Sequence, residues 1–304
     1  MNSERIKGHI FVLIANIIFG AFFPISKYLL NADVSSVMLT MARFSGATFL
    51  LWILSIFLPD NKITLRALWE LFLLGFFGIF IGQWLFLFAL GHTSPVDASV
   101  IVTISPLTTL IVSAIVLGDS ITLRKIVGIA IGATGAIRFI LSNAGDVPVS
   151  QGSAFGNILM LSTTIFGAIY FVASKPVVKR YGSITMMKWI FLYCTIMFIP
   201  YFYVECADEL VVFTKLDVKG WAALLYIVVC STFLTYILLP AGIKRMRPTT
   251  VSMYIYVQPI VASVIAISMG QDTFSWGKLL AALFVFSGVY LVTSSPRELD
   301  KSSQ

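Results

Sequence analysis

The sequence has little charge and few of the residues that carry chemistry in soluble enzymes. Only 12% of its 304 residues are Asp, Glu, Lys or Arg, against roughly 25% in an ordinary soluble domain. It has three cysteines and two histidines, too few for a disulfide framework or a His-rich metal motif. Neither a phosphate-binding loop nor a nucleophile elbow occurs. We therefore expect no enzyme, no ATP-driven machine, no catalytic residues, no metal and no cofactor.

Apolar residues take the place of charge. They make up 58% of the chain, and the mean hydropathy is +0.94. One core of this size cannot hide so much apolar surface, so the surplus must face lipid. A crossing takes about 20 apolar residues. Because a lipid-exposed backbone must satisfy its own hydrogen bonds, long apolar blocks must be helices. The predicted fold class is an all-α integral membrane protein.

Charged residues, prolines and polar clusters divide the chain into ten apolar blocks. These are residues 8–30, 34–58, 67–90, 95–117, 125–142, 153–174, 184–204, 219–239, 248–269 and 277–294. Ten crossings put both termini on one side. With that side cytoplasmic, fifteen of the 21 Lys and Arg lie in inner connections, and the outer ones hold only Lys27, Lys215, Lys219 and Lys278. This bias follows the positive-inside rule.

The net charge of +7 therefore orients the chain and does not indicate nucleic-acid binding. The first block has no evident cleavage site, and we expect it to be a retained helix. We predict a multi-pass protein of the cell membrane, the bacterial inner membrane being favoured, with both termini cytoplasmic.

An internal repeat is visible at an offset of 153 residues. It superposes Pro95 on Pro248, Ser99 on Ser252, Pro106 on Pro259, Asp119 on Asp272 and Gly135 on Gly288. Earlier in each half, Phe19-Gly20-Ala21 mirrors Phe166-Gly167-Ala168. The repeat predicts two five-helix halves, residues 1–145 and 146–304. Because five is odd, the second half enters the membrane inverted, as in many secondary transporters. The alternative is chance similarity between apolar segments of biased composition.

Short motifs follow one another along the chain in a specific order. They are Phe19-Gly20, Ala42-Arg43-Phe44, Thr93-Ser94-Pro95-Val96-Asp97-Ala98 leading to Ser105-Pro106, and Leu117-Gly118-Asp119 followed by Gly128 and Gly135. Together they resemble the drug/metabolite transporter superfamily, specifically its ten-helix EamA-like branch, over nearly the whole chain. The resemblance implies two EamA-like halves, cytoplasmic termini, and export or exchange of small metabolites. Asp119 departs from it, since the family usually has Glu there.

Arg43 is the most unusual residue of the apolar blocks. It lies well inside the second block, where an arginine costs about 2.5–3.5 kcal/mol on insertion. One interpretation is a cation that faces a watery cavity and binds a substrate carboxylate through two parallel hydrogen bonds. The other is a structural arginine bound to carbonyls or to a neighbouring helix. The matched position of the second half is Phe191, so such a site would be asymmetric.

Ser105-Pro106 and Gln258-Pro259 occupy corresponding points of the fourth and ninth blocks. Proline removes a backbone donor and exposes a carbonyl one turn earlier. Matched interruptions in two halves are a pointer to a transport site. We therefore predict Ser105 and Gln258 as substrate-binding residues, with Tyr254 nearby, and Pro106 and Pro259 as hinges. The alternative is that the prolines merely curve packed helices.

Other polar and aromatic residues lie at membrane depth. An amide in lipid lacks partners, so we expect Gln83 to face inward and bind substrate. Trp84 can stack on substrate or simply pack against its neighbours, and Asn16 and Tyr170 are similar candidates. Lys27 and Lys175 end the first helices of the two halves and are predicted gate charges, although lysines at helix ends commonly snorkel.

Two glycine pairs have the spacing that allows helices to approach closely. We expect Gly78 and Gly82 to pack internally. Gly128 and Gly132 are compatible with internal packing or with a dimer contact, so the protein is expected to be a monomer or a homodimer.

The sequence as a whole predicts a secondary transporter, an exporter or exchanger of small metabolites such as amino acids or related compounds. Its partners would be the lipid bilayer and a small-molecule substrate. The deep parts of the blocks carry no Asp or Glu, which favours facilitated export or exchange over tight proton coupling. The alternatives are an intramembrane or lipid-modifying enzyme, which would need a reactive pair at membrane depth, and a non-transporting membrane scaffold.

Overall fold

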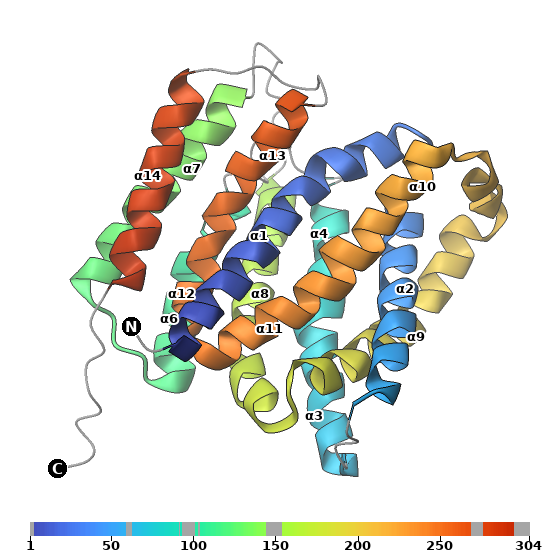
Figure 1. The fold of residues 1–304 in the computed structure, drawn as a ribbon, viewed down its shortest axis with the longest axis horizontal. Coiled ribbons are helices and arrows are strands. Elements are labelled where there is room, and N and C mark those ends of the chain that lie inside the picture. The colour runs from blue at the N-terminus through green and yellow to red at the C-terminus, as the bar shows by residue number, and fades with distance from the viewer. Residues whose placement is uncertain are drawn as a thin grey trace.

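The computed structural model describes residues 3–58, 63–90, 92, 101–102, 104–143, 154–268 and 276–294, and every regular element in these ranges is a helix. The helices are α1 (Ser3–Leu30), α2 (Ser36–Ile56), α3 (Leu65–Gly75), η1 (Phe76–Phe80), α4 (Ile81–Leu90), α6 (Ser105–Leu117), α7 (Leu123–Asn143), α8 (Ala154–Tyr181), α9 (Ser183–Cys206), η2 (Ala207–Lys215), α10 (Val218–Leu225), η3 (Tyr226–Leu234), α11 (Thr235–Arg245), α12 (Pro248–Met253), η4 (Tyr254–Tyr256), α13 (Val257–Ser268) and α14 (Trp276–Thr293) (Figure 1).

Six helical segments of the described chain are long and apolar enough to cross a membrane. They are Ser3–Leu30, Ser36–Ile56, Leu65–Phe86, Ile158–Tyr181, Ser183–Cys206 and Val218–Arg245. Their outer surfaces expose large apolar side chains, for example Phe49 at 66% and Val204 at 80%. Such surface is unfavourable in water and normal in lipid. The fold is therefore that of an all-helical integral membrane protein. The other four predicted blocks also contain helices, namely α6, α7, α12 with α13, and α14.

Two helices run further than the sequence predicts. The sixth block was expected to end at residue 174 and the eighth at 239, whereas the helices continue to Tyr181 and Arg245. Each extension passes through a proline, Pro176 or Pro240. A proline inside a helix removes one hydrogen bond but need not end the helix, and in both cases the last turn carries basic residues that suit the negative end of the helix dipole.

Two segments that lie 153 residues apart fold in the same way. Helix α3 starts after Thr64, whose side chain accepts a hydrogen bond from the Ala67 N–H. Helix α10 starts after Asp217, whose side chain accepts from the Gly220 N–H. Each then passes through a π-helical segment, η1 or η3, into a further α-helix. Such π-helical turns are rare in proteins, and those that do occur are often at functional sites.

Helices α2 and α9 pack along each other in opposite directions. The Phe44 ring lies 5.6 Å from that of Phe198, while the Trp52 ring lies 5.3 Å from that of Trp189. As the residue number rises along α2, the number of its partner falls along α9. The pair therefore forms an antiparallel, aromatic contact.

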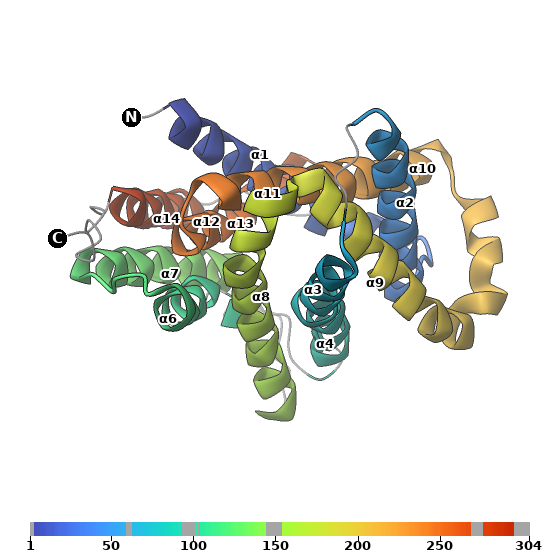
Figure 2. The same ribbon diagram turned by 90° about the horizontal axis from the view of Figure 1, so that it is seen from below.

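Helices α7 and α14 lie side by side at one end of the molecule (Figures 1 and 2). A Cβ atom at Gly288 would lie 2.5 Å from the Gly128 carbonyl oxygen and 2.6 Å from the Gly132 nitrogen. Only glycine permits this approach. The Gly128 and Gly132 pair is thus used for packing inside the chain. In the same way, Gly78 packs against the ring of Tyr170.

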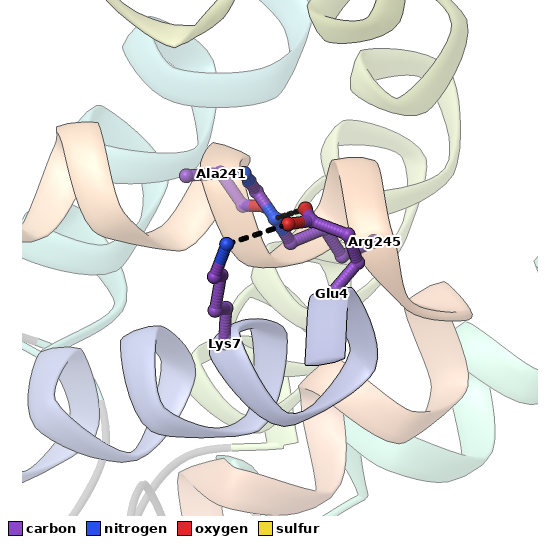
Figure 3. Close-up of polar contacts among 4 residues, drawn as sticks. All are labelled: Glu4, Lys7, Ala241 and Arg245. Carbon is purple, nitrogen blue, oxygen red and sulfur yellow. Dashed lines mark hydrogen bonds and ion pairs between the residues drawn. The ribbon is translucent and has the colours of Figure 1, made fainter. Parts of the chain in front are cut away.

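Helix α1 is held at its start by α11. The Arg245 Nε donates to a Glu4 carboxylate oxygen at 2.9 Å, and Lys7 Nζ donates to the other at 2.8 Å (Figure 3). Arg245 also donates to the Ala241 carbonyl. These contacts join the first and last turns of two helices that run in opposite directions.

Helix α1 runs parallel to the segment from η4 to α13. His9 Nδ1 lies 2.7 Å from the Tyr254 hydroxyl, and further along Gln258 Nε2 donates to Asn16 Oδ1 at 2.8 Å. Both residue numbers rise together along this contact. Helix α1 therefore joins the two predicted halves over much of its length.

Candidate functional site

A cavity of about 260 Å³ lies between α1, η1, α4, α6, α8, α11 and the segment from α12 to α13. Its lining residues are Asn16, Phe19, Gly78, Ile79, Gly82, Gln83, Phe86, Val102, Ser105, Thr163, Thr164, Gly167, Ala168, Tyr170, Phe171, Tyr236, Leu239, Val251, Ile255 and Gln258. These residues are mostly apolar or aromatic, with a few amides and hydroxyls and no charged side chain. Such a mixture is typical of small-molecule sites, and the cavity is slightly smaller than their usual volume of about 300–1,000 Å³. The size and chemistry suit a small, uncharged or singly charged solute.

Matching positions of the two predicted halves line this cavity. Four pairs separated by 153 residues contribute to it, namely Gln83 with Tyr236, Phe86 with Leu239, Val102 with Ile255, and Ser105 with Gln258. The cavity is thus built from the same places in two similar segments, but the residue types at those places differ.

The two predicted hinges lie at helix starts. Helix α6 begins at Ser105, with Pro106 in its first turn. Helix α13 begins at Val257, directly after the 3-10 helix η4, and includes Pro259, whose side chain lies outside the described part. The sequence placed each proline at an interruption inside an apolar block. Each proline lies in the first turn of its helix, Pro106 in α6 and Pro259 in α13, and the 3-10 helix η4 directly precedes α13.

Asn16 and Gln258 join α1 to α13 at the cavity wall. Asn16 is 2% exposed, its Nδ2 donates to the Val12 carbonyl at 2.8 Å, and its Oδ1 accepts from Gln258. Both amides are thereby at least partly satisfied, as buried amides must be. The contact is polar, short and formed between the two predicted halves.

Three further predicted residues also reach the cavity. Ser105 is nearly buried, and its carbonyl accepts from the hydroxyls of Thr108 and Thr109. Gln83 is half-buried on α4. The Tyr170 hydroxyl lies 3.9 Å from the sulfur of Met187. The structure therefore gathers Asn16, Gln83, Ser105, Tyr170 and Gln258 around one cavity.

Tyr236 also lines the cavity but was absent from the predicted set. Its ring meets those of Phe19 and Phe191 edge-on, at centroid distances of 5.8 and 4.9 Å. The repeat contained a signal that could have found it, because Gln83 was a candidate and Tyr236 lies 153 residues further on.

Arg43 lies one layer behind the cavity rather than in its wall. It is 7% exposed, its Nε donates to the Thr232 hydroxyl at 3.0 Å, and its guanidinium lies 4.7 Å from the ring centroid of Phe22. It also interacts electrostatically with Tyr236. Among the residues that the structure describes, no carboxylate pairs with Arg43.

The remaining predicted residues lie outside the cavity lining. Trp84 is 40% exposed and stacks on Phe88 at 5.6 Å. Tyr254 is buried against His9. Lys175 is half-buried on α8, and the Lys27 side chain falls outside the described residues.

An all-helical membrane protein with a small, partly open cavity between its helices has the architecture of a transporter. The chain belongs to the EamA-like transporter family, which matches residues 6–141 and again residues 154–294. The resemblance found in the sequence is thereby confirmed, and the family places the protein among membrane transporters.

Relatives and one solved structure agree with this assignment. The chain is 27% identical to the uncharacterized inner membrane transporter YedA of Escherichia coli (strain K12), over 91% of this chain and 90% of that one. It is 23% identical to the uncharacterized transporter YyaM of Bacillus subtilis (strain 168), over 94% and 93%. It is 24% identical to the protein WALLS ARE THIN 1 of Arabidopsis thaliana, over 95% and 83%. A solved crystal structure matches with a TM-score of 0.75 at 14% identity, over 94% and 96%, and shows the same fold.

Proposed function

We propose that the protein is a secondary transporter that exports or exchanges small metabolites, such as amino acids or related compounds, across the bacterial inner membrane. The cavity lined by matching positions of both halves carries this proposal. Sites between two such repeats are where secondary transporters bind their substrates. In this proposal both termini lie in the cytoplasm, and Asn16, Gln83, Ser105, Tyr170 and Gln258 contact the substrate.

Packing between α2 and α9 supports two inverted halves, residues 1–145 and 146–304. Thr48 and Thr195 lie 147 residues apart, at the offset that relates Phe19 to Phe166 and one residue from the offset of 148 that relates Arg43 to Phe191, and their hydroxyl oxygens are 2.8 Å apart. When a residue of one helix contacts its own counterpart on an antiparallel helix, the two helices are related by a two-fold axis that passes between them, perpendicular to their length. An axis in that direction relates halves that enter the membrane in opposite senses.

Alternating access would use the irregular helical turns beside Pro106 and Pro259. The 3-10 helix η4 departs from the regular ladder directly before α13, and the first turn of α6 contains a proline that lacks an N–H donor, which makes both places where helices can bend. Rocking of one half against the other at these points would open the cavity to each side in turn. Lys27, in the last turn of α1, and Lys175, which lies inside α8 six residues before its end, are proposed to close the opposite faces.

Efflux from vesicles tests the proposal. Purified protein is reconstituted into liposomes loaded with the twenty amino acids, and the external medium is analysed by mass spectrometry. Gly167→Leu fills the cavity, because a Cβ at this lining residue would have no neighbour within 4 Å. Ile158→Phe, on the lipid-facing side of the same helix at 64% exposure, is the matched control.

We expect wild type and Ile158→Phe to release one or more amino acids faster than loaded liposomes without protein. The efflux rate of Gly167→Leu should be at least about tenfold lower than that of wild type. Efflux that is no faster than leakage, or that is indifferent to Gly167→Leu, would contradict transport through this cavity.

A further inference from the structure

The cavity wall contains no charged side chain, yet a buried cation lies directly behind it. Arg43 donates to the Thr232 hydroxyl at 3.0 Å, and Tyr236, four residues after Thr232, lines the cavity. In the described part of the chain the ion pairs are those of Glu4 and Glu70 with Lys7, Arg66, Arg180 and Arg245. None of them involves Arg43, so its charge is not neutralised by a carboxylate of these residues.

Geometry fixes the guanidinium beside Tyr236. Thr232 and Tyr236 are four residues apart and therefore lie one above the other on the same helix face. The 3.0 Å bond from Arg43 Nε to the Thr232 hydroxyl anchors the guanidinium at that face. The ring of Phe22, 4.7 Å away, covers it, which keeps the cation where water and lipid do not screen it.

The hydrogen-bonding capacity of the two groups decides where the Tyr236 proton points. A guanidinium has only donors, so the phenol oxygen can act toward it only as an acceptor. The hydroxyl proton is then left for another acceptor. Among the described residues no carbonyl or side chain accepts a hydrogen bond from the Tyr236 hydroxyl, and the residue lines the cavity. A hydroxyl polarised by a neighbouring cation is a stronger donor, and its best acceptor is an anion.

We infer that the Tyr236 hydroxyl, held and polarised by Arg43, binds the carboxylate of a small organic monoanion. The inference rests on the proposed function and narrows its substrate class. The lining residues include no Asp or Glu to balance a substrate ammonium group. Small carboxylic acids without a free amine, such as N-acylated amino acids or hydroxy acids, therefore fit better than zwitterions, and organic cations fit worst. Tyr236 is a specificity-determining residue and Arg43 positions it.

Four leucine derivatives of similar size separate the charge states. N-acetyl-leucine is an anion, leucine a zwitterion, N-acetyl-leucinamide neutral and leucinamide a cation. Binding is measured by thermal stabilisation of the purified protein, and transport is measured by efflux from vesicles. We expect N-acetyl-leucine to bind at least about tenfold more tightly than N-acetyl-leucinamide, equal to about 1.4 kcal/mol, with leucinamide weakest.

Tyr236→Phe keeps the ring between Phe19 and Phe191 and removes only the hydroxyl. It should bring the ratio of anion to neutral binding close to one without lowering the unfolding temperature. Arg43→Gln should lower the same ratio, while Arg43→Lys, which keeps a cation, should retain part of it. Tyr226→Phe is the matched control, because Tyr226 lies on the same apolar segment, Val218–Arg245, donates to the Ile18 carbonyl and is outside the cavity lining.

The outcomes separate this inference from the proposed function. Equal binding of the anionic and neutral probes to the wild type, a ratio that survives Tyr236→Phe, or binding of no probe would overturn the inference. If both probes cross the membrane equally and Gly167→Leu stops both, transport stands and carboxylate recognition is wrong. If N-acetyl-leucine binds with the expected ratio but no probe crosses, recognition stands and transport is wrong.

Discussion

Residues 65–90 and 218–245 share a backbone and differ in chemistry. Both begin with a side-chain cap, contain a π-helical turn and place matching residues at the cavity. Among the matched pairs that differ are Gly78 with Ser231, Ile79 with Thr232, and Gln83 with Tyr236. The first segment offers glycine, an aliphatic chain and an amide, while the second offers hydroxyls and a phenol.

The difference teaches where the specificity of a duplicated fold resides. Thr232 anchors Arg43 beside Tyr236, whereas Ile79 at the matching place could anchor no cation. The matched position of Arg43 itself is Phe191, which is fully buried and apolar. The two segments thus line one cavity together, and Arg43 is bound to the second of them.

The largest effect is expected where the two segments tolerate different side chains. Position 89 in the first segment is a fully buried alanine, and position 242 in the second is glycine. A Cβ at Gly242 would overlap the Val12 side chain on α1. Gly242→Ala should therefore destabilise the protein by about 1–3 kcal/mol, measured by SDS titration in mixed micelles. When Val12→Ala is combined with Gly242→Ala, the total loss of unfolding free energy should be smaller than the sum of the two separate losses, because the smaller side chain relieves the overlap. Strictly additive losses would argue against the overlap.

Exchanging the two matched polar residues sharpens the comparison. Tyr236→Gln should reduce the preference for N-acetyl-leucine over N-acetyl-leucinamide by at least about tenfold, or about 1.4 kcal/mol. Adding Gln83→Tyr restores a phenol to the cavity but not a cation behind it. The double variant should therefore remain unselective in the binding assay. Recovery of the preference would mean that Arg43 is dispensable.

A smaller difference is expected between the two contacts that join the halves beside the cavity. Asn16 and Gln258 share a 2.8 Å hydrogen bond, while the Thr108 hydroxyl reaches the Thr164 carbonyl at 3.3 Å and also bonds its own helix at Ser105. Hydrogen bonds between membrane helices average about 0.6 kcal/mol and reach about 1.7. A double-mutant cycle of Asn16→Ala with Gln258→Ala should give a coupling in that range.

Thr108→Val should cost less than either alanine change in the same titration. A coupling near zero for Asn16 and Gln258, or a larger loss for Thr108→Val, would mean that the Thr108 contact is the more stabilising of the two.

The smallest effect concerns the threonines that face each other across α2 and α9. Thr195 also donates to the Phe191 carbonyl at 2.8 Å, so Thr48 must be the donor in their shared bond. Thr48→Val should cost at most about 0.6 kcal/mol. Thr195→Val should cost somewhat more, because it leaves the Thr48 hydroxyl without this acceptor. Equal unfolding free energies for the two variants would show that the pair is not directional.

The sequence by itself determined the class of fold, because the energetics of lipid allow little else. Apolar blocks with few charges must be helices in a membrane, and the family is readable from motifs such as Phe19-Gly20 and Leu117-Gly118-Asp119. The amides Asn16, Gln83 and Gln258 were identifiable for the same reason, since a buried amide needs a partner or a cavity. Helix ends were less predictable, because α8 and α11 continue through Pro176 and Pro240, and only neighbouring helices decide whether an internal proline ends a helix.

Only the tertiary structure decided which side chains share a wall. Arg43 and Tyr236 are far apart in sequence, and whether the arginine faces the cavity or stands behind a tyrosine depends on how α2 packs against η3. Contacts of that kind depend on how each helix is rotated about its axis. A helix that is apolar on all sides gives little indication in its sequence of which face points inward. The glycines that set these approaches, Gly128, Gly242 and Gly288, acquire their meaning only from what lies opposite them.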